Sequence, residues 1–220
     1  SNRFLIVSLL CLFLFAMLGF ADDYKKVTEK NSKGISSWTK ISFQFLFSLI
    51  ISFVLFFYVF DSTELNYIVP FFKDVSISLG ILFVPISIFI IVGSSNAVNL
   101  TDGLDGLAIL PVILITSALG LIAWSAGNII VSEYLYIPYI QGTGELLVIC
   151  GALIGAGIGF LWFNAYPAQI FMGDVGSLSM GAFIALVAII VRHEIVFAVM
   201  SLVFIMEALS VILQVSSFKI

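Results

Sequence analysis

Five aspartates occupy three short polar segments that interrupt an otherwise apolar chain. Asp22 and Asp23 are adjacent, Asp102 and Asp105 belong to the second segment, and Asp174 stands in the third. Hard cations such as Mg²⁺ take oxygen ligands, and a bound cation often bridges carboxylates to the phosphates of a substrate. If the three segments meet in space, the sequence predicts a site for Mg²⁺ and a diphosphate.

The second segment carries its polar groups at helical spacing. Asn96, Asn99 and Gly103 recur at intervals of three and four residues, and so do Asn99, Asp102 and Gly106. A helical turn here would stack amide and carboxylate oxygens on one face. For each of the three segments alone, a structural role is a competing interpretation: a solvated cap, a polar loop with turn glycines, or a helix N-cap.

The elements that must position these side chains are membrane-spanning helices. Apolar residues make up 61% of the chain and charged residues 10%, which leaves too little polar surface to cover a soluble protein. Continuous apolar runs of about 20 residues indicate helices rather than a barrel. We expect an all-α integral membrane protein, a polytopic bundle of about seven transmembrane helices. The predicted spans are Phe4 to Ala21, Ile41 to Phe60, Val75 to Gly93, Leu107 to Ala126, Leu146 to Phe163, Gly176 to Val191 and Ile195 to Phe218.

The basic residues orient the predicted bundle. Five of the nine fall in one connection: Lys25, Lys26, Lys30, Lys33 and Lys40. The positive-inside rule places that connection in the cytoplasm, and counting spans from there puts all three acidic segments on the cytoplasmic side. We expect residues 1–220 to form a single transmembrane domain with active-site loops near 22–40, 94–106 and 164–176.

Other patterns limit the alternatives. No Walker-type or Rossmann glycine motif is present, so a soluble nucleotide-binding fold joined to the membrane part is not indicated. The partners we expect include the lipid bilayer and no nucleic acid. His193, in a short turn on the opposite side, is not expected to be catalytic. The loop 127–145, also on that side, is expected to form a small hairpin around Tyr134 to Tyr139 at the membrane interface.

An ion-coupled transporter remains an alternative function, although a transporter would place its carboxylates near mid-membrane rather than at one rim of the bundle.

Four motifs resemble those of the polyprenyl-phosphate N-acetylhexosamine-1-phosphate transferases of glycosyltransferase family 4. They are Asp22-Asp23-Tyr24-Lys25-Lys26, the run NAVNLTDGLDGLA from Asn96 to Ala108, the run FMGDVGSL from Phe171 to Leu178, and Met206-Glu207 through Gln214. The second and third motifs are long and specific, and the similarity runs along nearly the whole chain. Within the family, the chain looks like the branch that acts on the muramoyl-pentapeptide nucleotide of bacterial cell-wall synthesis.

The resemblance implies an activity. Undecaprenyl phosphate would attack the β-phosphate of UDP-N-acetylmuramoyl-pentapeptide in the bacterial plasma membrane, with Mg²⁺ required, and the products would be UMP and the lipid-linked sugar diphosphate called lipid I. A carboxylate could act as a base in one step or as a covalent nucleophile in two, and we favour the single step. The residues of the second and third motifs favour this donor over UDP-N-acetylglucosamine, the donor of a sister transferase.

The resemblance also assigns roles to individual residues. Asp174 matches the metal ligand, Asp22 and Asp23 match a pair that activates the lipid phosphate, and Asp102 and Asp105 match further active-site carboxylates. The residues matched to substrate binding are Lys26 and Lys40 at the phosphates, Asn96 and Asn99 in the active site, and Gly103, Leu104, Asn164, Phe171 and Gln214 around the nucleotide, with Phe171 stacked on uracil. Members of the family have ten spans, so we expect a fragment that supplies the third to the ninth and, as in the family, a homodimer.

Overall fold

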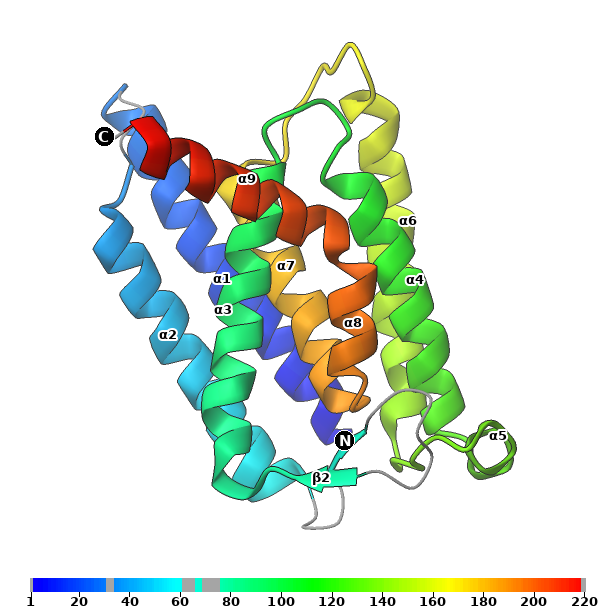
Figure 1. Ribbon diagram of the computed structural model, residues 1–220. Coiled ribbons are helices and arrows are strands. Elements are labelled where there is room, and N and C mark those ends of the chain that lie inside the picture. The colour runs from blue at the N-terminus through cyan, green and yellow to red at the C-terminus, as the bar shows by residue number, and fades with distance from the viewer. Residues whose placement is uncertain (1, 31–33, 61–65, 69–75, 219–220) are drawn as a thin grey trace.

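Long helices dominate the computed structural model, which describes residues 2–30, 34–60, 66–68 and 76–218 (Figure 1). The long helices are α1 (Arg3–Thr28), α2 (Ser37–Val54), α3 (Phe83–Thr101), α4 (Ile109–Ala126), α6 (Leu146–Asn164) and α7 (Gly173–Ile190). Short turns lengthen three of them: η1 (Leu55–Val59) continues α2, η3 (Gly80–Leu82) precedes α3 and η4 (Thr143–Glu145) precedes α6. All six are long and apolar enough to cross a membrane, which confirms a polytopic helical membrane protein.

The last predicted span is broken. In place of one helix from Ile195 to Phe218, the chain forms α8 (Glu194–Met200) and α9 (Leu202–Phe218), which are bent by 68° relative to each other. Figure 1 shows that α8 continues the bundle, whereas α9 runs obliquely across α3. The seventh predicted span is therefore present only if this bent pair counts as one span.

Two connections also differ from the predictions. The residues between α2 and α3 include a small antiparallel pair, β1 (Asn66–Ile68) with β2 (Ser76–Ser78), so the helical span begins at Gly80 and not at Val75. The expected hairpin in the loop 127–145 is replaced by a short helix, α5 (Ile129–Leu135).

Helix α7 is the centre of the bundle. Its sequence from Met180 to Ile190 is almost entirely apolar, as expected for a helix that is enclosed on all sides. Of its 18 residues, 78% are buried, whereas only 17% are buried in the most apolar 18-residue stretch of η4 and α6. The most extensive contacts of α7 are with α1 and α3. Gly19 allows the close approach of α1, because a Cβ atom at this position would collide with the backbone of Asp174.

The three polar segments meet at one end of the bundle. Helix α1 runs on through Asp22 and Asp23 as far as Thr28, and α3 runs through Asn99 as far as Thr101. Asp174 lies in the first turn of α7. The ends of α1 and α3 and the start of α7 lie on the same side in Figure 1, so helix ends, rather than flexible loops, carry these groups.

Candidate active site

A cluster of charged and polar side chains joins α1, α2, α3 and α7 at this end of the bundle. We call it the polar cluster, and its members are Asp22, Asp23, Lys26, Lys40, Asn99 and Asp174. All six were predicted as site residues from the sequence. The structure joins them in one connected network of contacts, while their catalytic and binding roles stay predictions.

Asp174 is the centre of the polar cluster. Lys40 Nζ lies 2.6 Å and Lys26 Nζ 3.1 Å from its Oδ2 atom. Asn99 donates a hydrogen bond of 2.6 Å to Oδ1 and another of 2.8 Å to the hydroxyl oxygen of Ser177. Both carboxylate oxygens are therefore held, one by two ammonium groups and the other by an amide, which fixes the orientation of the carboxylate.

Asp22 is the most deeply buried member, with a side chain only 1% exposed. A buried carboxylate is costly unless it is paired, and here Lys26 Nζ lies 2.5 Å and Lys40 Nζ 3.2 Å from Oδ2. The backbone N–H of Ile35 donates a 2.7 Å hydrogen bond to Oδ1. Asp22 and Lys26 are four residues apart on α1 and share a face, which accounts for their pairing.

Two carboxylates from other segments cap the start of α7. Asp23 Oδ2 accepts a 3.2 Å hydrogen bond from the backbone N–H of Val175, and Asp102 accepts one from the backbone N–H of Gly173. The first backbone N–H groups of a helix have no partner within the helix, and its N-terminus carries a partial positive charge. The two aspartates therefore help to fix α7, and with it Asp174, against α1 and α3.

Asp102 follows the last residue of α3 and is half-buried. Burial, together with the negative charges of Asp174 and Asp23, raises the pKa of its carboxyl group to about 6, against the opposing effect of the hydrogen bond from Gly173. Asp102 is thus placed to change its protonation state near neutral pH.

Three carboxylates are close enough together to hold a divalent cation. Asp22, Asp23 and Asp174 each offer an oxygen within 4.8 Å of the others. Mg²⁺ takes oxygen ligands, commonly one or two carboxylates together with water and substrate phosphates. The donor set therefore fits the cation that the sequence predicts, and the ammonium groups of Lys26 and Lys40 now compensate the same oxygens.

One turn deeper, a pair of amides joins α2 to α3. Asn96 Nδ2 donates to Gln44 Oε1 at 2.8 Å, and Gln44 Nε2 donates to Asn96 Oδ1 at 3.4 Å. Asn96 was predicted to bind substrate, and this stays a prediction; in the structure its side chain contacts Gln44 and the carbonyl oxygen of Val92. Its place in the structure is directly beneath Asn99, which contacts Asp174.

Asp105 and Asn164 connect the loop after α3 to the loop after α6. Asp105 Oδ2 accepts a 3.0 Å hydrogen bond from the backbone N–H of Ala168. Asn164 Oδ1 accepts one of 3.1 Å from the N–H of Gly106, and its Nδ2 donates to the carbonyl oxygen of Ile170 at 2.8 Å. The structure shows both residues organising these loops, and their predicted roles in catalysis and nucleotide binding stay predictions.

The remaining predicted nucleotide-binding residues lie on the surface. Gly103 is exposed, and the side chains of Leu104 and Phe171 belong to residues that are 68% and 70% exposed. Gln214 lies on the exposed side of α9, where its amide donates to the hydroxyl of Ser210 at 3.2 Å. These residues surround the polar cluster's end of the bundle rather than belonging to the cluster itself.

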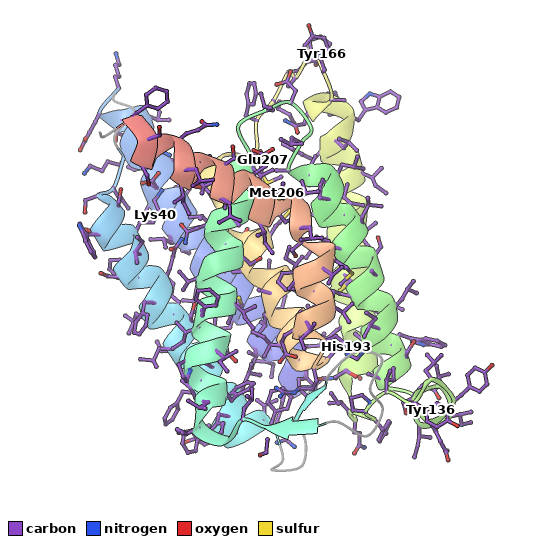
Figure 2. All side chains as sticks on the ribbon, in the orientation of Figure 1. Lys40, Tyr136, Tyr166, His193, Met206 and Glu207 are labelled. Carbon is purple, nitrogen blue, oxygen red and sulfur yellow. The ribbon has the colours of Figure 1, made fainter. Side chains whose placement is uncertain are left out.

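Two residues labelled in Figure 2 lie at opposite ends of the bundle. Figure 2 places Lys40 at the end of the bundle that holds the polar cluster and His193 at the other end, as the sequence predicts. Figure 2 also shows Glu207 on the stretch of α9 that crosses α3.

Several contributors escaped the sequence analysis. Gln44 was missed, although a glutamine inside an apolar span is itself a signal. Ser177 was part of a quoted motif but was given no role. The backbone donors of Ile35 and Val175 carry no signal in the sequence, since every residue except proline has the same group.

The fold and the polar cluster together define a multi-pass membrane protein with an ionic site at one end of its helices. The sequence model described as glycosyl transferase family 4 matches residues 5–192, so the chain belongs to that family. The chain is therefore a transferase of the kind that moves a phospho-sugar onto polyprenyl phosphate. The matched range contains the polar cluster in full and stops before α8.

Proposed function

We propose that this protein transfers phospho-N-acetylmuramoyl-pentapeptide from UDP-N-acetylmuramoyl-pentapeptide to undecaprenyl phosphate, giving lipid I and UMP. The observation that carries the proposal is Asp174, held by Lys26, Lys40 and Asn99 beside Asp22, in a chain of glycosyl transferase family 4. The long motifs around Asn99 and Asp174 support the muramoyl donor over N-acetylglucosamine. The lysine-rich connection between α1 and α2 supports a cytoplasmic position for the site.

The proposed reaction is an in-line displacement at phosphorus. An oxygen of the undecaprenyl phosphate forms a bond to the β-phosphorus, and the bond from that phosphorus to the bridging oxygen breaks, so UMP leaves with the bridging oxygen. Asp22 or Asp23 accepts the proton that the attacking phosphate loses. Lys26 and Lys40 exchange their carboxylate partners for phosphate oxygens and so bind the charged groups of both substrates.

The same site suits Mg²⁺ as the cofactor. Asp174 would hold the cation, and Asp22 and Asp23 offer further oxygens within reach of it. The cation supplies charge neutralisation at the diphosphate oxygens. Asn99 keeps Asp174 oriented through its 2.6 Å hydrogen bond, whichever cation lies beside the carboxylate.

The exposed residues around the polar cluster supply the proposed nucleotide contacts. Phe171 is 70% exposed, which leaves its ring available to stack on uracil. The loop that carries Phe171 is tied to α6 through Asn164 and to the loop after α3 through Asp105. Gly103 and Leu104 belong to that second loop, so both sides of a bound nucleotide would be held by connected segments.

The test is transfer of radiolabel from UDP-N-acetylmuramoyl-pentapeptide to undecaprenyl phosphate by the purified protein, with Mg²⁺ and with EDTA. We expect Mg²⁺-dependent formation of labelled lipid and release of UMP. Transfer only from UDP-N-acetylglucosamine would assign the sister activity instead. Failure with both donors, together with substrate flux into vesicles, would replace the proposal by a transporter.

A further inference from the structure

Helix α5 (Ile129–Leu135) projects sideways from the end of the bundle opposite the polar cluster. In Figure 1 it is seen almost end-on, so it runs across the direction of α4 and α6 rather than along it. Figure 2 shows Tyr136, the residue that ends this helix, at the outermost corner of the same end. This helix is too short to cross a membrane, and the proposed reaction makes no use of it.

The loop that carries α5 is fastened to the helices on either side. The backbone N–H of Ile140 donates a 2.9 Å hydrogen bond to the carbonyl oxygen of Ala126, the last residue of α4. The buried hydroxyl of Thr143 donates to the carbonyl oxygen of Ala123 at 3.0 Å. These bonds fix the position of α5 relative to the spans.

The outward side of α5 consists mainly of large apolar side chains, beside which the charged Glu133 is also exposed. Ile129, Ile130 and Tyr134 are 61%, 76% and 80% exposed, whereas Ser132 is buried against the bundle. Large apolar side chains exposed together, on a helix held in place, indicate a surface that is covered in the natural setting.

The lengths of the flanking spans place this surface at the edge of the hydrocarbon layer. At 1.5 Å per residue, the 18 residues of α4 and 19 of α6 extend about 27 and 28 Å, close to the thickness of the bilayer core. Helix α5 begins three residues after α4 ends, and so lies at the boundary of that core. Trp124 and Val148, near the same ends of α4 and α6, are 45% and 73% exposed, so the lipid-facing surface continues up to α5.

We propose that α5 lies in the interfacial layer of the bilayer, with Ile130 and Tyr134 inserted among the lipids of the leaflet opposite the polar cluster. Tyrosine suits this layer because its ring is apolar and its hydroxyl is polar. The segment 127–145 contains two glutamates and no lysine or arginine. The contact therefore depends on apolar insertion and not on attraction to anionic lipids.

The experiment measures how deep single side chains lie. Ile130→Cys and Tyr134→Cys are labelled with a nitroxide, with Gln141→Cys as the control from a polar, exposed position of the same loop. The native Cys11 and Cys150 are both buried, and labelling of the unsubstituted protein gives the background. The proteins are placed in phosphatidylethanolamine vesicles with and without phosphatidylglycerol, and nitroxide collisions with oxygen and with a water-soluble nickel chelate are recorded.

We expect the oxygen-to-nickel collision ratio at positions 130 and 134 to be several-fold higher than at 141, and unchanged by phosphatidylglycerol. Nickel-accessible labels at 130 and 134 would place α5 in water and overturn the proposal. Labels shielded from both reagents and broadened by neighbouring spins would show that a second copy of the chain, not lipid, covers the helix. A ratio that rises only with phosphatidylglycerol would overturn the claim that charge has no part. None of these outcomes depends on the proposed transferase activity.

Discussion

Gln44 of α2 and Asn96 of α3 face each other as two primary amides and exchange hydrogen bonds in both directions. Each lies about one helical turn from a residue that contacts Asp174: Lys40 on α2 and Asn99 on α3. The amide pair therefore sets the separation of α2 and α3 close to the level at which Lys40 and Asn99 contact the carboxylate of Asp174. Gln44 itself is fully buried.

Gln44→Leu should destabilise the protein by about 1–3 kcal/mol, because the partly buried amide of Asn96 loses both of its hydrogen bonds to the fully buried Gln44. The measurement is the free energy of unfolding in mixed micelles. Ser48→Ala is the matched control: Ser48 lies one turn further along α2, is equally buried, and its hydroxyl forms no hydrogen bond with any described residue. Equal losses for the two variants would show that the amide pair contributes nothing specific.

Asp174→Asn should reduce transfer of labelled phospho-sugar by more than about 100-fold and abolish its dependence on Mg²⁺, since a bound cation supplies several kcal/mol of charge stabilisation. The neutral amide keeps the shape of the side chain but loses its attraction to Lys26 and Lys40. His193→Ala, at the opposite end of the bundle, should keep near-normal activity. Wild-type rates for the asparagine variant would remove Asp174 from the metal site.

The pH dependence of stability should carry the signature of Asp102. Its folded-state pKa of about 6 lies above the ordinary value of 3.8, so its contribution to stability is fully present below pH 3.8 and is lost as the pH rises through 6. Asp102→Asn keeps an acceptor for the N–H of Gly173 but cannot ionise. In EDTA, the melting temperature of the variant minus that of the wild type should increase from pH 4.5 to pH 7.5. A constant difference would mean that Asp102 titrates normally.

Gly173→Ala should destabilise the junction between α1 and α7. Gly173 has φ of +64°, which costs an L-residue about 1–2 kcal/mol, and an added Cβ would lie 2.7 Å from Asp23 Oδ2. Asp23 would then lose its hydrogen bond to Val175, and thermal unfolding should report the loss. Gly151→Ala is the control on α6, where an added Cβ meets no neighbour; the change should be neutral or slightly stabilising. The reverse order of the two variants would contradict this account.

Arg192→Met should destabilise the other end of the bundle by about 3–5 kcal/mol, because it leaves the buried Glu194 without its cation. The two side chains are 3.4 Å apart, and the guanidinium also lies over the rings of Phe60 and Phe83. The double variant Arg192→Met with Glu194→Gln should recover most of the loss in the same unfolding assay. If it recovers none, the ion pair with Glu194 is not what makes Arg192 stabilising.

The sequence was sufficient to predict the helices because continuous apolar runs leave a membrane chain few other solutions. It did not predict the bend between α8 and α9. The residues on both sides of Ser201 are apolar, and neither glycine nor proline marks the break. Hydropathy reports burial in lipid but not the direction of a helix, so such a bend is set by packing against α3.

The chemistry of the candidate site was also predictable, whereas its partners were not. The spacing of Asp22 and Lys26 anticipates their contact on one face of α1. The contact of Lys40 with Asp174 joins residues 134 positions apart and depends on how α2 and α7 pack, which no local pattern records. The contact of Asn96 with Gln44 likewise depends on how α2 and α3 pack, and the role of Asn96 in substrate binding stays a prediction.

The polar cluster has more negative than positive charges. Its three carboxylates, from Asp22, Asp23 and Asp174, contact two ammonium groups. One negative charge is left over, and the neighbouring Asp102 adds another once the pH is above its pKa of about 6, so the site as it stands repels an incoming diphosphate. A divalent cation bound there would offset these charges and remove the repulsion. The sign of the local field thus makes the order of arrival matter, with the cation ahead of the nucleotide or carried in by it.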